Sequence, residues 1–356
     1  MAISTLQIDI RKSTQSHLPD LNASELKFGR VFSDHMFTAD FVNGSWTDLQ
    51  VQPFGPLSLS PANAMMHYGQ SIFEGLKAYK NAAGEIRVFR PEMNARRLNQ
   101  SATRMCMATL PEEIFIEGIK ALMRVDADWV PEAEGRSMYI RPFMIATDDF
   151  LGVRPSESYK FLVIASPSGS YYGDEVRVKI ERSYSRASAG GTGSAKTAGN
   201  YAAALYPAKL AQEDGYDQLI WTDSKEHKYI EEAGTMNVMF LQGTDTLITS
   251  PLTSTILPGV TRDSILQIAR DWGMQVEERP IAVDEIVAGI ENGTITDAFG
   301  VGTAATIAHI SEIGMEGNNY TLPPVASRNF SLKMKAYLED LKRGRVEDPY
   351  GWMVTC

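Results

Sequence analysis

The stretch SRASAGGTGSAKTAGNY, residues 185–201, divides this chain of 356 residues into two well-patterned halves. Together with PSGSYYGD, residues 167–174, it concentrates glycine, serine and alanine. Such a change of composition indicates a domain boundary. We therefore expect a small N-terminal domain over residues 1–175 and a larger C-terminal domain over residues 176–356, joined by a Gly/Ser-rich linker near residues 167–190.

The N-terminal half mixes strand and helix patterns. Asn43-Gly44 lies between two apolar-rich runs and predicts a hairpin, and Gly84 marks a second one. Apolar spacing predicts helices over residues 91–105, with Pro91 in the first turn, and over residues 112–130. Strands are expected over residues 137–146 and 159–167.

The C-terminal half also alternates strands and helices. Gly215 closes a predicted helix, and Thr261 is the expected N-cap of a second helix that ends at Gly273. Strands are expected over residues 175–184, 216–223, 236–243, 246–251 and within 295–310, and helices over 202–214, 262–273, 283–293 and 326–345. Hairpins mixed with helices in both halves indicate two α/β or α+β domains.

Composition excludes several classes of protein. The formal net charge is −10, from 34 Lys+Arg against 44 Asp+Glu, so nucleic acid or an anionic membrane is not expected as the main partner. No apolar run is long enough to span a bilayer, and the N-terminus lacks the apolar region of a secretory signal. We therefore expect a cytoplasmic protein.

Cysteine and histidine are too sparse for a metal or disulfide framework. Cys106 and Cys356 are the two cysteines, and the five histidines form no HExxH or His-x-His pattern. No metal site is therefore expected.

Lys196 is the first candidate for chemistry. It lies among small residues with no neighbouring carboxylate, which lets a cofactor approach and favours a neutral amine. A neutral amine can form a Schiff base with an aldehyde. A flexible linker, a solvated lysine and a phosphate loop remain alternatives. The last one lacks the required glycine, since Ala195 precedes the lysine.

The pair Glu231-Glu232 is the second candidate. Adjacent residues on a strand point to opposite faces, so only one of the two can face a pocket. A carboxylate beside a pyridine nitrogen would keep that nitrogen protonated and make the ring an electron sink. An exposed acidic pair at a strand end is the alternative.

Two glycine-containing stretches suit an anion such as phosphate. LPGVTRDS, residues 257–264, puts backbone N–H groups at a predicted helix N-terminus, and GVGTAAT, residues 300–306, forms a glycine-rich turn. Arg96 and Arg97 add positive charge on a predicted helix. Each feature is common by itself, because helix caps and surface arginines occur in most proteins.

Taken together and in order, these stretches resemble one family. The chain is similar to the branched-chain amino-acid aminotransferases, pyridoxal-5′-phosphate enzymes of fold type IV, from about residue 28 to about residue 350. The motifs that carry the resemblance are HYGQSIFEGLKAYK, FRPEMNARRL, VDADWVP, YIRPF, LGVRP, GGTGSAKTAGNYAAAL, IEEAGTMN, LPGVTRDS and VGTAA.

The resemblance implies roles for individual residues toward the cofactor. Lys196 would hold it as a Schiff base, Tyr201 would bond its phenolic oxygen, and Glu232 would face its ring nitrogen. The remaining residues implied to bind the cofactor, mainly its phosphate, are Arg97, Thr235, Val260, Thr261 and Thr303.

The resemblance also implies a substrate pocket. Thr303 and Ala304 would receive the substrate carboxylate, and Arg141 would help an apolar pocket to accept glutamate. Tyr68 and Val153 would reach across the interface of a homodimer. The other side chains implied to line the pocket are Phe28, Phe73, Tyr139 and Tyr171.

The implied reaction is reversible amino transfer between leucine, isoleucine or valine and 2-oxoglutarate, by a ping-pong mechanism. A D-amino-acid aminotransferase or an aminodeoxychorismate lyase would keep Lys196 and Glu232 but need a different pocket. The chain departs from animal members at one point. The C-x-x-C pair that follows their G-T-A turn is replaced by Ala305 and Ala308.

Overall fold

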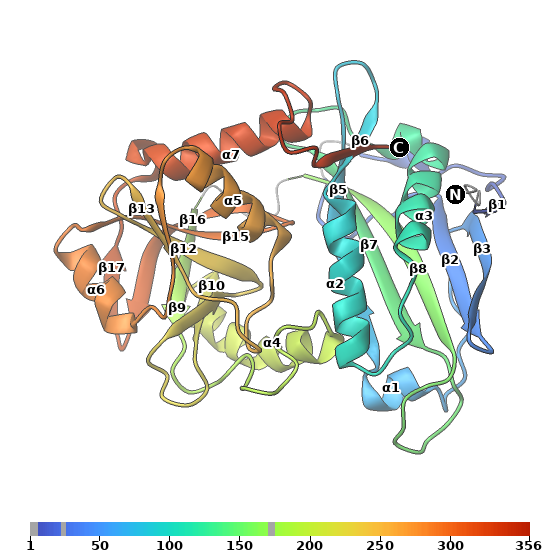
Figure 1. Cartoon of the computed structure of the whole chain (residues 1–356), viewed down its shortest axis with the longest axis horizontal. Coiled ribbons are helices and arrows are strands. Elements are labelled where there is room, and N and C mark those ends of the chain that lie inside the picture. The colour runs from blue at the N-terminus through green and yellow to red at the C-terminus, as the bar shows by residue number, and fades with distance from the viewer. Residues whose placement is uncertain (1–5, 23–25, 170–174) are drawn as a thin grey trace. The chain divides into compact units, whose positions relative to one another are not determined.

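The structure, a computed structural model, describes residues 6–22, 26–169 and 175–356. The chain forms two compact units (Figure 1). The first unit comprises Met1–Tyr171, Ala195–Ala198 and Asp340–Cys356, and the second comprises Tyr172–Ser194 and Gly199–Glu339. The units are not two consecutive halves of the sequence, because two later segments return to the first unit. Residues 170–174 of the expected linker lie outside the described residues.

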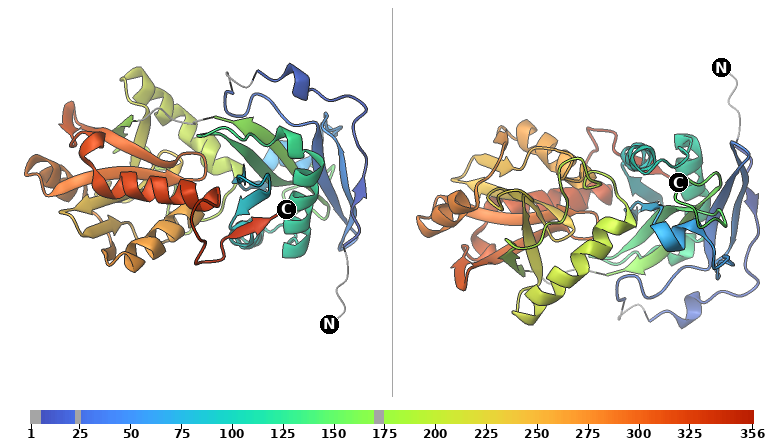
Figure 2. Two further views of the ribbon diagram at one scale, coloured as in Figure 1. Left: turned by 90° about the horizontal axis from the view of Figure 1, so that it is seen from above. Right: turned by 90° about the horizontal axis from the view of Figure 1, so that it is seen from below.

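The first unit is built on a mixed sheet in the order β1-β3-β2-β8-β7-β5-β6-β18, with β4 paired to β7. Strand β1 lies beside β3 at one edge, and the C-terminal strand β18 lies beside β6 at the other (Figure 2). Its strands are β1 (Asp9–Ile10), β2 (His35–Val42), β3 (Ser45–Pro53), β4 (Ser71–Phe73), β5 (Leu76–Lys80), β6 (Ile86–Phe89), β7 (Ser137–Ala146), β8 (Tyr159–Ser168) and β18 (Met353–Thr355). Its helices are α1 (Ala64–Tyr68), α2 (Pro91–Arg104) and α3 (Glu112–Val125).

Local sequence explains much of this unit. Asn43 and Gly44 both have positive φ, 52° and 79°, as a tight turn between β2 and β3 requires. Pro91 begins α2, where its missing N–H costs nothing. The predicted hairpins, helices and strands of this half are therefore confirmed, although α3 ends at Val125, before the end of its predicted range.

The core of the first unit lies between α3 and the sheet. Phe37 on β2, Phe115 on α3 and Phe161 on β8 are fully buried, and the ring of Phe161 contacts both others. Burial of each such side chain contributes about 1.5–3 kcal/mol to folding. This core holds the sheet against α3.

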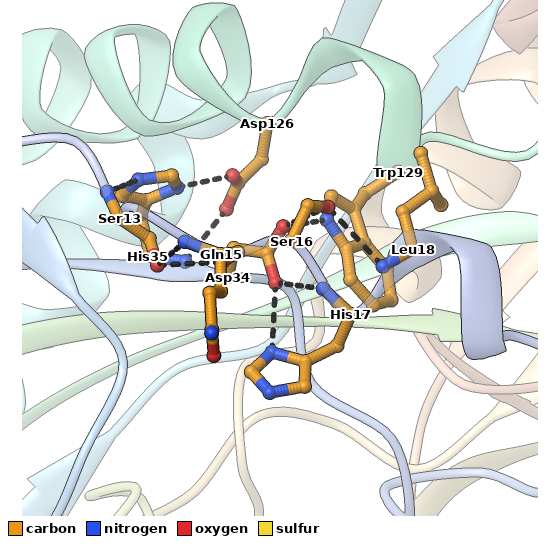
Figure 3. A network of polar contacts seen from close by, with 9 residues as sticks. All are labelled: Ser13, Gln15, Ser16, His17, Leu18, Asp34, His35, Asp126 and Trp129. Atoms are coloured by element: carbon orange, nitrogen blue, oxygen red, sulfur yellow. Dashed lines mark hydrogen bonds and ion pairs between the residues drawn. The ribbon is translucent and has the colours of Figure 1, made fainter.

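Asp34 fastens the N-terminal segment to the first unit (Figure 3). Its carboxylate accepts hydrogen bonds from Oγ of Ser16 at 2.6 Å, from the backbone N–H of His17 at 2.9 Å and from Nε1 of Trp129 at 2.8 Å. The Asp34 side chain is 7% exposed. One acid therefore joins residues that lie more than a hundred positions apart.

His35 forms a second connection between the N-terminal segment and the rest of the first unit (Figure 3). Its Nε2 accepts the backbone N–H of Ser13 at 2.8 Å, and its Nδ1 lies 2.6 Å from Oδ1 of the buried Asp126. Because Nε2 accepts, the proton of a neutral imidazole lies on Nδ1 and is donated to Asp126. The two contacts connect the N-terminal segment to the end of α3.

The second unit is built on another mixed sheet, in the order β11-β10-β9-β16-β15-β12-β13-β14, with β17 paired to β16. Its strands are β9 (Glu175–Ile180), β10 (Gln218–Thr222), β11 (Ile230–Ala233), β12 (Met236–Gln242), β13 (Thr246–Thr249), β14 (Gln275–Glu278), β15 (Ile295–Gly302), β16 (Thr306–Met315) and β17 (Asn318–Thr321). Its helices are α4 (Ala198–Glu213), α5 (Val260–Asp271), α6 (Val283–Glu291) and α7 (Asn329–Lys342). The first residue of α4 and the last turn of α7 are assigned to the first unit.

One expectation for this unit is wrong. Thr261 does not cap α5, because the helix begins at Val260 and its N-cap is Gly259. The other predicted elements of this half are confirmed, and Gly215 and Gly273 follow α4 and α5 with positive φ. A glycine is preferred there because other residues rarely adopt that backbone conformation.

No helix within the described ranges is long and apolar enough to cross a membrane.

Candidate active site

Glu232 is a buried carboxylate on β11 with partners at both oxygens. Its Oε2 lies 2.6 Å from Nε of Arg186. Its Oε1 accepts from the backbone N–H of Leu257 and from Nδ2 of Asn237, each at 3.0 Å. Asn237 is the cross-strand neighbour of Glu232 on β12, so the register of the sheet brings the amide to the carboxylate. The charge-assisted contact with Arg186 fixes the orientation of the acid.

Arg186 connects two loops to that carboxylate. Its Nη1 donates to the backbone oxygen of Thr255 at 2.6 Å, and its Nη2 donates to that of Gly193 at 3.2 Å. A side chain at Gly193 would place a Cβ 2.5 Å from the Thr255 oxygen, so the glycine allows the two loops to meet. The glycine-rich loop is thereby held beside Glu232.

Glu231 has different surroundings. Its Oε1 accepts from Oγ1 of Thr255 at 2.5 Å, and the residue is partly exposed. Burial raises the pKa of Glu231 above its usual value, although the Thr255 hydrogen bond and the charge of Arg186 act in the opposite direction. The two adjacent carboxylates therefore differ, and Glu232 is the one that lines a hollow.

That hollow lies within the second unit. Tyr201 enters its lining from the first turns of α4, and Thr235 from the turn between β11 and β12. Its lining residues are Arg186, Asn200, Tyr201, Ala204, Glu232, Gly234, Thr235 and Leu257. A carboxylate, a phenol and a guanidinium thus share one small cavity.

The start of α5 offers N–H groups that no residue of its own helix can bond. Gly259 is the N-cap, and Val260 and Thr261 form the first turn of a helix of 12 residues. A Cβ at Gly259 would collide with the side chain of Asn237, so the helix start depends on glycine there. The same Asn237 bonds Glu232, which links the helix start to the carboxylate.

Sheet register also locates the turn at Thr303 and Ala304. Asn237 is paired with Glu232 on one side and with Val301 of β15 on the other. Val301 precedes Thr303 by two residues, and the turn joins β15 to β16. The carboxylate and this turn therefore lie at neighbouring positions along the sheet.

Lys196 belongs to the first unit, where its backbone is fixed on both sides. Its N–H donates to Oγ of Ser101 on α2 at 2.9 Å, and its carbonyl accepts the N–H of Phe73 at 3.0 Å. Oγ1 of Thr197 donates to the carbonyl of Ser71 at 2.8 Å. The Lys196 Nζ lies 4.9 Å from the centroid of the Phe73 ring. The lysine backbone is thus attached to β4 and α2.

Arg97 and Arg96 lie on different faces of α2. Arg97 is buried and forms a two-point contact with the carboxylate of Glu74, with distances of 2.9 Å and 2.7 Å. Arg96 is exposed and lies 3.5 Å from a carboxylate oxygen of Glu112. Of the two arginines, Arg97 is therefore the one with a fixed orientation.

Four of the expected pocket residues form one cluster in the first unit. Phe28 contacts Tyr139 edge-on with ring centroids 4.7 Å apart. Arg141 donates from Nη2 to the Tyr139 hydroxyl at 2.8 Å, and its Cζ lies 4.7 Å from the centroid of the Phe73 ring. An arginine stacked on aromatic rings keeps its fork available for a carboxylate while its stem packs against apolar surface.

Three other expected pocket residues lie elsewhere. The Tyr68 hydroxyl donates to the carbonyl of Leu151, so it is not among the groups that contact Arg141 within the described residues. Tyr68 is 43% exposed and Val153 is 86% exposed. Tyr171 lies outside the described residues. Tyr68 at the end of α1 and Val153 on the loop before β8 are thus open to solvent in the single chain.

The expected site residues divide between the two units. Those of the first unit are Phe28, Tyr68, Phe73, Arg97, Tyr139, Arg141, Val153 and Lys196, and those of the second are Tyr201, Glu232, Thr235, Val260, Thr261, Thr303 and Ala304. Across the described ranges, no group of three His, Cys, Asp or Glu side chains could hold a metal ion.

Three residues of the site have no place in the sequence argument: Glu74, Arg186 and Asn237. Each contacts a predicted site residue through a side chain. Each lies inside a motif or stretch quoted above, and this is the one feature of the sequence that could have marked it as a site residue. Their partners are distant in the sequence or across a strand, and spacing alone does not pair them.

Comparison with known proteins identifies the family of this chain. Residues 71–313 match the model of the family described as amino-transferase class IV. Over 356 residues the chain is 43% identical to branched-chain-amino-acid aminotransferase 2 of Bacillus subtilis, covering 99% of this chain and 97% of that one. Over 334 residues it is 46% identical to the branched-chain-amino-acid aminotransferase of Mycolicibacterium smegmatis, covering 92% and 91%.

A solved structure has the same fold. It is the crystal structure of the branched-chain amino acid aminotransferase of Escherichia coli, with a TM-score of 0.72, 25% identity and coverage of 90% of this chain and 98% of that one. This similarity confirms the expected mixed α/β fold of type IV. The chain therefore belongs to the class IV aminotransferase family.

Proposed function

We propose that this chain is a pyridoxal-phosphate-dependent branched-chain aminotransferase. It would move an amino group reversibly between leucine, isoleucine or valine and 2-oxoglutarate by a ping-pong mechanism. One observation carries the proposal: the Phe73 ring has the Nζ of Lys196 4.9 Å from its centroid and the Cζ of Arg141 4.7 Å from it. An amine and a guanidinium beside one apolar ring suit side chains that are either apolar or acidic. The names of the relatives support branched-chain amino acids as one substrate class.

The residues of the second unit fit pyridoxal phosphate. The buried carboxylate of Glu232 suits a protonated ring nitrogen, and Tyr201 in the same hollow suits the phenolic oxygen. The start of α5 and the turn at Thr303 provide N–H groups for a phosphate. When bound, this cofactor supplies an aldehyde that condenses with amines and a ring that accepts electrons.

The chain's own residues would then perform the remaining work. Lys196 would take the proton from the substrate Cα and deliver it to C4′ of the cofactor, acting as base and then as acid. Glu232 would hold a proton at the ring nitrogen. The backbone at Thr303 and Ala304 would bind the substrate carboxylate. Arg141 would pair with the second carboxylate of glutamate or 2-oxoglutarate.

We also propose a homodimer. Val153 and Tyr68, with Leu151 at 59% exposure, present apolar surface that a folded single chain rarely leaves open. In the dimer, Tyr68 and Val153 would reach the partner's substrate pocket. Light scattering should give twice the chain mass, and Val153→Asp should shift the population toward monomer. A wild-type protein that stays monomeric at assay concentration would contradict this.

Absorption spectra test the proposed reaction. Purified protein should be yellow; leucine should remove the visible band, and 2-oxoglutarate should restore it. Chromatography should find the oxo acid of leucine after the first addition and glutamate after the second. Conversion of D-alanine in place of leucine would favour a D-amino-acid aminotransferase, and conversion of aminodeoxychorismate would favour the lyase. A colourless protein that binds nucleoside triphosphate would overturn the proposal.

A further inference from the structure

Glu74 is a fully buried acid whose carboxylate holds side chains of α2. It lies directly after β4 and is 0% exposed. Its Oε1 accepts from Nε of Arg97 at 2.9 Å, and its Oε2 accepts from Nη2 of Arg97 and Nδ2 of Asn94, both at 2.7 Å. A two-point contact of this kind fixes the plane of a guanidinium as well as its position.

The same short strand and the same helix hold Lys196. Phe73, the residue before Glu74, donates its N–H to the Lys196 carbonyl. Ser101, which accepts the Lys196 N–H, follows Arg97 by four positions on α2 and therefore lies on the same face of that helix. The lysine backbone and the Arg97 guanidinium are thus fixed to one pair of elements, with Glu74 as the side-chain connection.

This inference rests on the function proposed above, in which Lys196 binds the aldehyde end of the cofactor and Arg97 binds its phosphate. One rigid molecule would then touch both residues, so the orientation of Arg97 relative to Lys196 decides whether both contacts form. We propose that Glu74 is a positioning residue that orients Arg97 toward the cofactor phosphate. Glu74 holds the Nε–Nη2 edge of the guanidinium, and because the group is planar this also fixes the direction of its Nη1 end.

The charge of Glu74 suits this role. An arginine that is 6% exposed is costly without a charged partner, and Glu74 supplies one whether or not a phosphate is bound. A glutamine at position 74 would offer one acceptor oxygen in place of two, so it could not bind the two N–H groups of the fork in parallel, and the guanidinium would be held less firmly. If the Glu74–Arg97 pair served stability alone, loss of Glu74 would not change the ratio between the affinities for a phosphorylated ligand and for the same ligand without its phosphate.

That difference defines the experiment. The full chain is freed of cofactor, and the dissociation constants of pyridoxal 5′-phosphate and pyridoxal are measured by absorption and tryptophan fluorescence. We expect Glu74→Gln to weaken binding of the phosphorylated form on the order of tenfold or more, and binding of pyridoxal less than about twofold. Glu74→Asp keeps the charge, shortens the reach and provides the same test if the amide variant does not fold.

Asp126→Asn is the matched control. Asp126 is also a buried acid of the first unit, 2% exposed, with a side-chain partner 2.6 Å away in His35. This variant should lower the melting temperature but leave the ratio of the two dissociation constants unchanged. Loss of both ligands in equal proportion from the Glu74 variants would overturn the positioning role.

A double-mutant cycle tests the route through Arg97. Arg97→Gln should weaken binding of the phosphorylated form, and adding Glu74→Gln should then change that affinity less than about twofold. Independent, additive losses would contradict the proposal. If the wild-type chain binds no pyridoxal phosphate, the proposed function fails first, and this inference falls with it. If the wild-type chain prefers pyridoxal 5′-phosphate to pyridoxal and the Glu74 variants do not, the result supports the positioning role of Glu74 and leaves the proposed function intact.

Discussion

Arg186 and Glu232 form a buried ion pair in the second unit, with 2.6 Å between Nε and Oε2 and side-chain exposures of 7% and 4%. The residues are separated by more than forty positions, yet the pair decides which of two adjacent acids has a fixed orientation in the hollow. Glu231 instead bonds Thr255 and stays partly exposed.

Glu232→Gln should lower kcat for leucine by about tenfold or more, and Glu231→Gln should change it less than about twofold. The reason is that only Glu232 combines burial, Arg186 and a place in the lining of the hollow. Removing one partner of a buried pair should also cost about 3–5 kcal/mol of stability. Steady-state kinetics and urea unfolding check both points, and equal kinetic effects of the two substitutions would contradict this geometry.

Lys196→Ala should abolish turnover and leave the protein folded. The backbone contacts of Lys196 with Ser101 and Phe73 do not depend on its side chain, so the free energy of unfolding should change by less than about 1 kcal/mol. The visible absorption band should be absent. Near-normal activity with an intact band would show that another residue binds the cofactor.

Arg141→Met should distinguish acidic from apolar substrates. Glutamate and leucine would share one space, and an unpaired carboxylate beside Phe28 and Phe73 would be costly. We expect kcat/KM for glutamate and 2-oxoglutarate to fall by an amount that corresponds to about 1.5–3 kcal/mol of lost transition-state stabilisation. The kcat/KM for leucine should change little. Tyr139→Phe is the matched control, since it removes the hydroxyl that Arg141 contacts but keeps the charge. Equal losses for both substrates would mean that Arg141 only supports the pocket.

Mild oxidation should not switch the enzyme off through a local disulfide. Ala305 and Ala308 take the positions of the paired cysteines in animal members, and Cys106 and Cys356 both belong to the first unit. Burial raises the pKa of the Cys356 thiol to about 11, so little reactive thiolate exists at neutral pH. Activity after peroxide treatment, with mass spectrometry of the thiols, checks this. Thiol-reversible inactivation with a mapped disulfide would refute it.

Asp34 should make stability depend on pH in the acid range. Burial by itself would raise its pKa, but hydrogen bonds from His17, Ser16 and Trp129 outweigh that effect and lower the pKa to about 2. Because the pKa is lower in the folded state, the ionised carboxylate stabilises the fold at pH values above its unfolded-state pKa near 4. This stabilisation is lost as the pH falls toward 2. Asp34→Asn should therefore cost about 2 kcal/mol at pH 6 and progressively less below pH 4. Urea unfolding of both proteins from pH 6 to pH 3 measures the difference, and a cost that does not vary with pH would contradict the assignment.

Much of the fold and part of the site follow from local sequence. The Asn43-Gly44 turn, the start of α2 at Pro91 and the glycine after α4 depend on backbone preferences of a few neighbouring residues. The small residues around Lys196 likewise mark it as a candidate Schiff-base lysine by local composition. The Thr261 cap failed because glycine also serves as an N-cap, and the chain enters α5 earlier than the side-chain preference suggests.

Other features depend on the tertiary structure alone. Glu74 meets Arg97 because β4 packs against α2, and Arg186 meets Glu232 because its loop is bonded to the loop that carries Thr255. Residues 195–198 and 340–356 return to the first unit through backbone pairing with β4 and β6. Local propensity acts over a few residues, whereas these contacts are set by which elements bury their apolar faces together. The sequence by itself therefore determined the elements and the candidate lysine, and packing decided which buried charges were paired.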